Sequence, residues 1–436
     1  MSLITLFYRS IYTITGYKSS GRKGAQTKDE EVLVMEKVSG QKRKSRLRGW
    51  VFWPPFLVLI MVLILGFVSQ DAFLKVVNGV KDWIWGNFKW LFSGYGLAAV
   101  GVCFYACFSK FGNTVIGGKD AKPILGKFNW FAISLCTTIA AGLMFWAAAE
   151  PLYLMSDPSP FFDIEPNSPQ AAVFAMAQMY LHWGITPYAI YALAATVFAF
   201  TYYNMKKPFS LGACISPLLG ERATKGRLAD IIDALCIFIL CAGMSGSLST
   251  GAFSVAGGIS NITGIPTNGM MLIIVMAAII LVYTISASSG IMKGIKWLSS
   301  FNVYIFSFLI LFIFLFGPTK FILNFGVESV GELMDSFFMR NLFTDSMNPG
   351  NSSWSSLGNM KVGYWASYLA WAPVTALFLG KLARGYKIRD CIIINLFVPT
   401  VFSMIWVSIF GGTAIHMHMQ ESLIPLLETS DRKSVV

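Results

Sequence analysis

Aromatic residues at helical spacing are the candidates for chemistry that stand out in this sequence. Tyr364, Tyr368 and Trp371 stand at positions i, i+4 and i+7, and Trp365 is adjacent to the first of them. On a helix, residues at these intervals lie on one face and form a stripe of rings. The segment therefore predicts an aromatic face on a helix.

A second aromatic group lies in the segment HWGITPYAIY, where Trp183, Tyr188 and Tyr191 project from a helix that Gly184 and Pro187 loosen. Aromatic faces attract a cation through the ring quadrupole, by about 0.5–2 kcal/mol per ring. Several rings around one point could form a cage for a quaternary ammonium ion, which has no N–H to donate. The alternative interpretation is that these rings only pack or form an interface belt.

Small residues and two carboxylates complete the set of unusual features. The run TIAAGLMFWAAAEP, which ends in Glu150 and Pro151, would let another helix or a ligand approach its backbone closely. Asp233 lies near the start of another apolar run. We interpret Glu150 as an interfacial cap or loop anchor, and Asp233 as a residue that compensates the dipole of its helix.

The composition indicates which kind of molecule must position these residues. Hydrophobic residues make up 55% of the 436 residues and charged residues 13%, whereas a soluble chain has roughly 25% charged residues. So few charges could not cover a soluble globule of this length, which excludes an ordinary cytosolic enzyme and a disordered chain. Because the alternation needed for barrel strands is absent, the sequence predicts an all-α, polytopic membrane helix bundle.

Nine apolar runs are long enough to cross a bilayer as helices, which takes about 20 residues each. They lie at about 50–69, 90–109, 128–149, 183–203, 229–256, 269–288, 297–317, 361–380 and 391–412.

The distribution of Lys and Arg predicts the orientation. The segment 1–49 is basic, and so are the loops after every second span, whereas the loop 150–182 has acidic residues and no Lys or Arg. Since Lys and Arg collect in cytoplasmic loops, we expect a cytoplasmic N-terminus in the cell membrane. The basic residues of these loops are Lys110, Lys119, Lys122, Lys127, Lys206, Lys207, Arg222, Lys225, Arg227, Lys293, Lys296, Lys381, Arg384, Lys387 and Arg389.

Metal, cofactor and nucleic-acid chemistry have no support in this sequence. Seven Cys fall mostly in apolar runs without a CxxC pair, and only three His occur. We interpret the Cys as small hydrophobic residues and expect no metal site and no cofactor. No nucleophile–base pair or phosphate loop is visible, so we do not expect an enzyme. The Lys and Arg excess belongs to the loops, which argues against nucleic-acid binding.

Taken together, these segments resemble the betaine/carnitine/choline transporter family from about residue 50 to the C-terminus. The stretches that carry the resemblance are GLMFWAAAEP at 142–151, HWGITPYAIYAL at 182–193, PLLG at 217–220, YWASYLAWAP at 364–373, ARGYKIRD at 383–390 and FGGTA at 410–414. Each stretch alone is weak evidence for the family, but together the stretches occur in the family's order and on the matching spans.

The resemblance implies a LeuT-like inverted-repeat fold of twelve helices, in which two peripheral helices precede two five-helix repeats. It divides this chain into a basic cytoplasmic tail (1–49), two peripheral helices and a loop (50–127) and a first repeat (128–317). An external loop with an amphipathic helix (318–358), the first two helices of the second repeat (359–412) and a C-terminal segment (413–436) follow. The second repeat is thus incomplete, and we expect that a longer protein has been cut short.

The resemblance also implies a substrate site and an ion site. The family's cage corresponds to Trp183, Tyr188, Tyr191 and Tyr368, with Tyr188 and Tyr368 where Trp is usual, and Trp371 is retained. Trp365, Gly142 and Met144 are further candidate substrate contacts, and Cys136 and Ile139 are candidate ion ligands. At the positions of the family's second sodium site stand Leu240 and Met244, which cannot ligate sodium, so sodium coupling is in doubt and proton coupling or exchange would also suit the family.

Two functional hypotheses follow. The first is secondary active transport of trimethylammonium solutes such as glycine betaine, choline or carnitine, with the substrate in the aromatic cage; the resemblance implies a homotrimer, and lipid surrounds the bundle. The second, motivated by the missing spans and the altered site residues, is a transport-inactive membrane remnant that acts as a partner or sensor.

Overall fold

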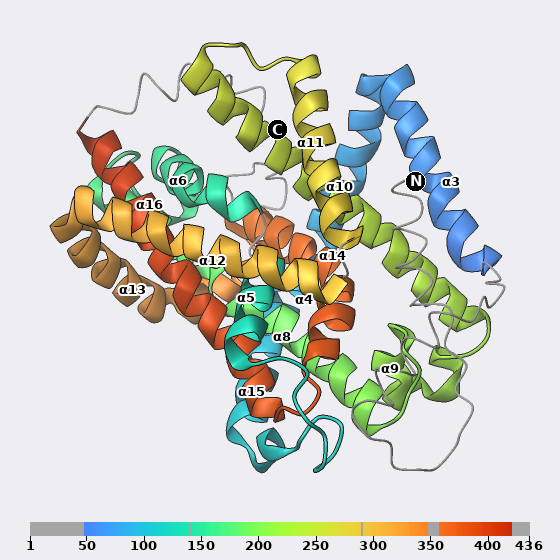
Figure 1. Cartoon of the computed structure of the whole chain (residues 1–436). Helices are drawn as coiled ribbons and strands as arrows, with labels where there is room; N and C mark the ends of the chain where they lie inside the picture. The colour runs from blue at the N-terminus through green and yellow to red at the C-terminus, as the bar shows by residue number, and fades with distance from the viewer. Residues whose placement is uncertain (1–47, 139–140, 289–290, 348–356, 421–436) are drawn as a thin grey trace.

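The computed structural model describes residues 48–138, 141–288, 291–347 and 357–420 (Figure 1). Helices account for nearly all of this part of the chain, and an isolated bridge between Val115 and Lys387 is the only β pairing within it. The helices of the first half are α3 Gly49–Val68, α4 Gln70–Phe108, α5 Lys127–Thr138, α6 Ala141–Ser156, α7 Pro169–Trp183, α8 Ile185–Ala199 and α9 Gly212–Leu219. Those of the second half are α10 Arg227–Thr263, α11 Gly269–Ser288, α12 Ile291–Phe316, α13 Thr319–Leu342, α14 Leu357–Leu382, α15 Ile388–Ile392 and α16 Val398–Met419.

Eight of the nine predicted spans contain a membrane-length helical segment, and the third contains two shorter helices. Eight helical segments are long and apolar enough to cross a membrane, and α5 and α6 form a ninth span if the pair, bent by 57°, is counted as one. The prediction of an all-α polytopic bundle is confirmed, and the chain is a multi-pass membrane protein.

Two helix boundaries differ from the prediction. The second span begins at Gln70, because the side chain of Ser69 caps the helix by accepting from the backbone N–H of Ala72 at 3.2 Å. The segment 150–182 is not a plain loop, since it contains α7, which Ser168 caps in the same way and Pro169 opens. Polar Gln178 and His182 lower the hydropathy of α7, which is why this segment was assigned to a loop.

The core of the bundle is the contact between α8 and α14, which is the most extensive pairing of helices in the described chain. Helix α7 packs against α6, α13 and α16, so α6, α7, α8 and α14 surround a common interior. Helices α10, α11 and α12 are predominantly apolar and largely exposed on the outside of this group (Figure 1). The buried polar side chains of the site therefore come from the inner helices.

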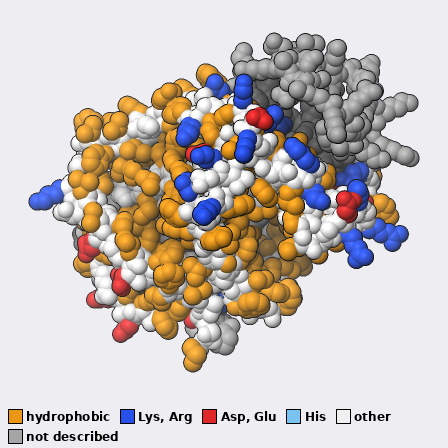
Figure 2. Space-filling model, turned by 90° about the horizontal axis from the view of Figure 1, so that it is seen from below, with side chains coloured by type: hydrophobic (Ala, Val, Ile, Leu, Met, Phe, Trp, Pro, Cys, Tyr) orange, Lys and Arg blue, Asp and Glu red, His pale blue; other side chains and the backbone are white. Residues whose placement is uncertain are grey.

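Three of the predicted basic loops lie together at one end of the bundle. The side chain of Asn204 donates to the carbonyl of Val115 at 2.9 Å, Val115 bridges to Lys387, and the hydroxyl of Tyr386 donates to the carbonyl of Leu125 at 2.5 Å. These contacts join the loops after α4, α8 and α14. Figure 2 shows Lys and Arg side chains gathered on this face, among hydrophobic ones.

Candidate functional site

Three rings predicted for the cage lie together. The ring centroids of Tyr191 on α8 and Tyr368 on α14 are 5.3 Å apart, and those of Trp183 on α7 and Tyr368 are 6.2 Å apart, both edge to face. All three side chains are buried. The hydroxyl of Tyr368 donates to the carbonyl of His182 at 2.9 Å, which fixes α14 against the end of α7.

Backbone geometry explains how Trp183 reaches this position. Helix α7 ends at Trp183, and Gly184 separates it from α8. A Cβ at Gly184 would lie 2.3 Å from the carbonyl oxygen of Tyr180, closer than any side chain tolerates. The absence of a side chain at Gly184 therefore allows the close turn that directs Trp183 toward α14.

Glu150 is the acidic centre of this site, and its interpretation as an interfacial cap or loop anchor is wrong. Its side chain is fully buried, because α6 continues past it to Ser156. Its carboxylate accepts from the Nδ1 of His182 at 2.5 Å, the Nε1 of Trp183 at 3.0 Å and the hydroxyl of Tyr364. The ring of Tyr364 also stacks on His182, with centroids 4.3 Å apart. One carboxylate thus holds two aromatic residues of the site.

A buried polar chain connects Glu150 to α13. The Nε2 atoms of His182 and Gln178 are 2.8 Å apart, and the guanidinium of Arg340 donates to the Oε1 of Gln178 at 3.1 Å. Arg340 also pairs with Glu332 at 2.6 Å. Burial lowers the pKa of the Arg340 guanidinium, and the bond to Glu332 opposes this shift. Four helices are therefore linked by the side chains that support the cage.

The other predicted cage residues have different partners. The hydroxyl of Tyr188 is 2.6 Å from the Oγ of Ser403 on α16. Trp365 is fully buried, and a Cβ at Gly96 of α4 would lie 2.9 Å from its Nε1. Trp371 faces α10, because a Cβ at Gly243 would lie 3.5 Å from its Nε1. Trp365 and Trp371 of the stripe on α14 therefore contact α4 and α10, whereas Tyr188 contacts α16.

The candidate residues of the third span do not lie together. Gly142 lies next to Trp183, since a Cβ there would lie 3.5 Å from the Cη2 of Trp183. Met144 is exposed on α6. The Sγ of Cys136 is 3.5 Å from the carbonyl oxygen of Ser299 on α12. Ile139 lies outside the described residues.

Two buried charges outside the cage connect helices. Asp233 on α10 accepts from Arg48 at 2.8 Å, so it forms an ion pair with the residue that precedes α3 and does not merely compensate a helix dipole. The ammonium of Lys361 on α14 donates to the carbonyls of Asn341 at 2.7 Å and Phe343 at 2.5 Å. Lys361 thereby satisfies carbonyl groups at the C-terminal end of α13.

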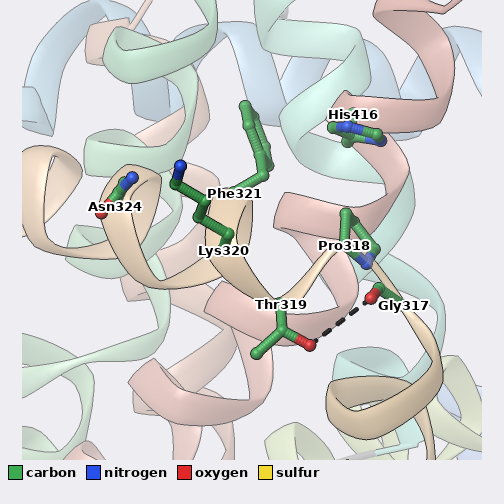
Figure 3. Close-up of a pocket in the computed structure, with 7 residues that line it drawn as sticks. All are labelled: Gly317, Pro318, Thr319, Lys320, Phe321, Asn324 and His416. Atoms are coloured by element: carbon green, nitrogen blue, oxygen red, sulfur yellow. Dashed lines mark hydrogen bonds between the residues drawn. The ribbon is translucent and has the colours of Figure 1, made fainter.

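A separate hollow of about 590 Å³ opens where α12 meets α13 (Figure 3). Lys320 and Asn324 lie on one side of it and His416 on the other, while the hydroxyl of Thr319 bonds to the carbonyl of Gly317. None of the predicted site residues lines it. Among the residues that the structure describes, no group of three or more His, Cys, Asp or Glu could hold a metal ion.

The fold and the site define a polytopic helical membrane protein with a buried aromatic site around one carboxylate. Residues 50–435 match the model of the BCCT family, described as betaine/carnitine/choline family transporters. The chain belongs to this family, whose members are transporters rather than enzymes.

Several curated proteins are similar to the chain over most of its length. The glycine betaine transporter OpuD of Bacillus subtilis (strain 168) is 30% identical over 85% of this chain and 71% of its own length. Glycine betaine transporter 1 of Vibrio parahaemolyticus is 32% identical over 83% of this chain and 68% of its own. The osmo-dependent choline transporter BetT2 of Acinetobacter baylyi is 29% identical over 88% of this chain and 55% of its own.

Proposed function

We propose that this protein is a secondary transporter of quaternary ammonium solutes of the glycine betaine and choline type. The observation that carries the proposal is the contact of Trp183, Tyr191 and Tyr368, which three different helices bring together in the interior. The similar proteins named as glycine betaine and choline transporters support the same class of solute. We place the protein in the cell membrane with its N-terminus in the cytoplasm.

The rings would bind the trimethylammonium group through their faces, since methyl groups on nitrogen leave no N–H for a hydrogen bond. The rings of Tyr191 and Tyr368 touch edge to face at 5.3 Å, so a guest requires them to separate. Because these rings belong to α8 and α14, binding would change the packing of the two helices that make the most extensive contact in the described bundle. Such a coupling of binding to helix movement is what alternating access needs.

The test is choline and glycine betaine binding to the full chain in lipid nanodiscs, together with uptake into cells that lack other transporters for these solutes. Each ring contributes about 0.5–2 kcal/mol, so Trp183→Ala and Tyr368→Ala should each weaken binding about 2- to 30-fold. Trp83→Ala and Tyr105→Ala, which alter exposed rings of α4, are the matched controls.

Unchanged affinity in both cage variants would contradict the cage. Binding to the wild type without any uptake would instead favour the second hypothesis, in which the chain is a membrane-embedded partner or sensor.

A further inference from the structure

The carboxylate of Glu150 has a role in the site that the aromatic cage alone does not explain. Its two oxygens accept three hydrogen bonds, from His182, Trp183 and Tyr364. A protonated acid would use one oxygen as a donor and needs an acceptor, whereas an ionised carboxylate only accepts. Each of the three partners can donate at the contacting atom, so all three bonds suit a carboxylate anion.

The chain of amide and guanidinium contacts keeps His182 in the form that donates to Glu150. Arg340 can only donate, so the Oε1 of Gln178 accepts from it and the amide NH₂ of Gln178 faces His182. The Nε2 of His182 must then accept, and its proton lies on Nδ1, directed at Glu150. In this arrangement His182 is a neutral imidazole and does not balance the charge of Glu150.

The cation to which this polar chain leads is already paired with another carboxylate. Arg340 is paired with Glu332 at 2.6 Å, and Gln178 and His182 separate it from Glu150. Within the described residues, the only ion-pair geometry of Glu150 is the one with His182. A buried anion that is stabilised by dipoles alone remains electrostatically receptive to a cation.

We propose that Glu150 is the counter-charge of the cage and makes the site selective for a positively charged guest over a neutral one of the same shape. It acts through the hydrogen bonds to the indole N–H of Trp183 and the phenol O–H of Tyr364, which draw electron density toward the ring faces. Its field also acts directly, because a charge is poorly screened in a low-dielectric interior. This inference rests on the proposed function and adds charge selectivity to it.

The experiment compares choline with its carbon isostere, in which a quaternary carbon replaces the nitrogen, for binding to the full chain and to Glu150→Gln. Glutamine keeps the size of the side chain and removes the charge. We expect choline affinity to fall about 10-fold in Glu150→Gln, while the affinity for the isostere changes less than about twofold. A purely structural role would weaken both ligands to the same extent.

A second variant covers the case in which Glu150→Gln does not fold. Tyr364→Phe keeps the ring and removes the hydroxyl that donates to Glu150. It should lower choline affinity about threefold and leave the isostere unaffected, because only the polarisation of one ring is lost.

The outcomes separate this inference from the proposed function. If the wild type binds neither choline nor glycine betaine, the proposed function fails and this inference fails with it. If the wild type binds choline and Tyr368→Ala weakens the binding, but the ratio of choline to isostere affinity is unchanged in both Glu150→Gln and Tyr364→Phe, only the role of Glu150 is overturned.

Discussion

Glu150 shows how the sequence can identify a residue and still misplace it. The apolar run was expected to end at this carboxylate, but α6 continues to Ser156, which moves Glu150 into the helix interior. A usable signal was present, because the segment 128–182 contains no Lys or Arg that could pair with it. Two of its partners, His182 and Trp183, are adjacent in the sequence, but only the ring of Trp183 entered the prediction.

Arg340 and Gln178 could not have been found from the sequence alone. The two residues lie on different helices, and their relation depends on the packing of α13 against α7. Spacing rules relate residues on one helix, at three or four positions apart. They relate Gln178 to His182, which are four apart, but they carry no information about a partner from another helix.

The positions expected to hold a second sodium ion lead to a prediction about coupling. Sodium is bound by oxygen atoms, and the side chains of Leu240 and Met244 offer none. We therefore expect choline uptake to persist when potassium replaces sodium on both sides of the membrane. The measurement is the initial rate of labelled choline uptake in proteoliposomes, with Tyr368→Ala as the control for uptake outside the cage. A rate that falls to the control level without sodium would show that another site, such as that predicted at Cys136 and Ile139, binds sodium.

At the level of helices, the stripe on α14 was predicted in its spacing but not in its partners. Tyr364 and Tyr368 contact α7 and α8, whereas Trp371 contacts α10. Seven residues of helix rise by about 10 Å, so the ends of the stripe lie at different depths of the bundle. Periodicity places residues on one face of a helix, but it does not say which helix lies opposite at each depth.

The break between α7 and α8 is the element on which the position of Trp183 depends. A Cβ at Gly184 would lie 2.3 Å from a backbone oxygen that cannot rotate away. Gly184→Ala should therefore shift α7 against α8 and weaken choline binding at least as much as Trp183→Ala does, about 10-fold or more. Binding to detergent-solubilised protein, with the thermal unfolding midpoint recorded in parallel, would measure this.

The matched control for this change is Gly101→Ala on α4, where no atom lies within 4 Å of the added methyl group. Alanine should stabilise that helix slightly, by about 0.5–1 kcal/mol, and leave binding unchanged. Wild-type affinity in Gly184→Ala would show that the break tolerates a side chain and that Trp183 is held mainly by its bond to Glu150.

On the scale of the whole molecule, the number of spans was predictable because lipid imposes a length and a composition on every crossing. The position of the basic loops at one end was also predictable, because each pair of membrane crossings returns the chain to the same side. The packing of α8 against α14 was not predictable. The segments that contain α8 and α14 are the two least apolar of the eight membrane-length segments, which marks them as inner helices but does not say that they pair.

The basic end of the bundle leads to a prediction about membrane orientation. Lys122 and Lys387 are exposed in loops that meet at this end, whereas Glu328 is exposed on α13, which packs against the opposite half of α16 through Gly412. In a variant without native cysteines, a membrane-impermeant maleimide should label Glu328→Cys in intact cells. It should label Lys122→Cys and Lys387→Cys only after permeabilisation, because Lys and Arg loops stay in the cytoplasm.

Because two labelling sites lie at the same end, a change in the accessibility of one loop alone would not be mistaken for a change in orientation. If Lys122→Cys and Lys387→Cys were both labelled in intact cells while Glu328→Cys was not, the N-terminus would lie outside the cytoplasm. The polar chain from Glu332 through Arg340 to Glu150 would then reach the cage from the cytoplasmic side instead of the external side. The orientation therefore decides from which side α13 can influence the cage.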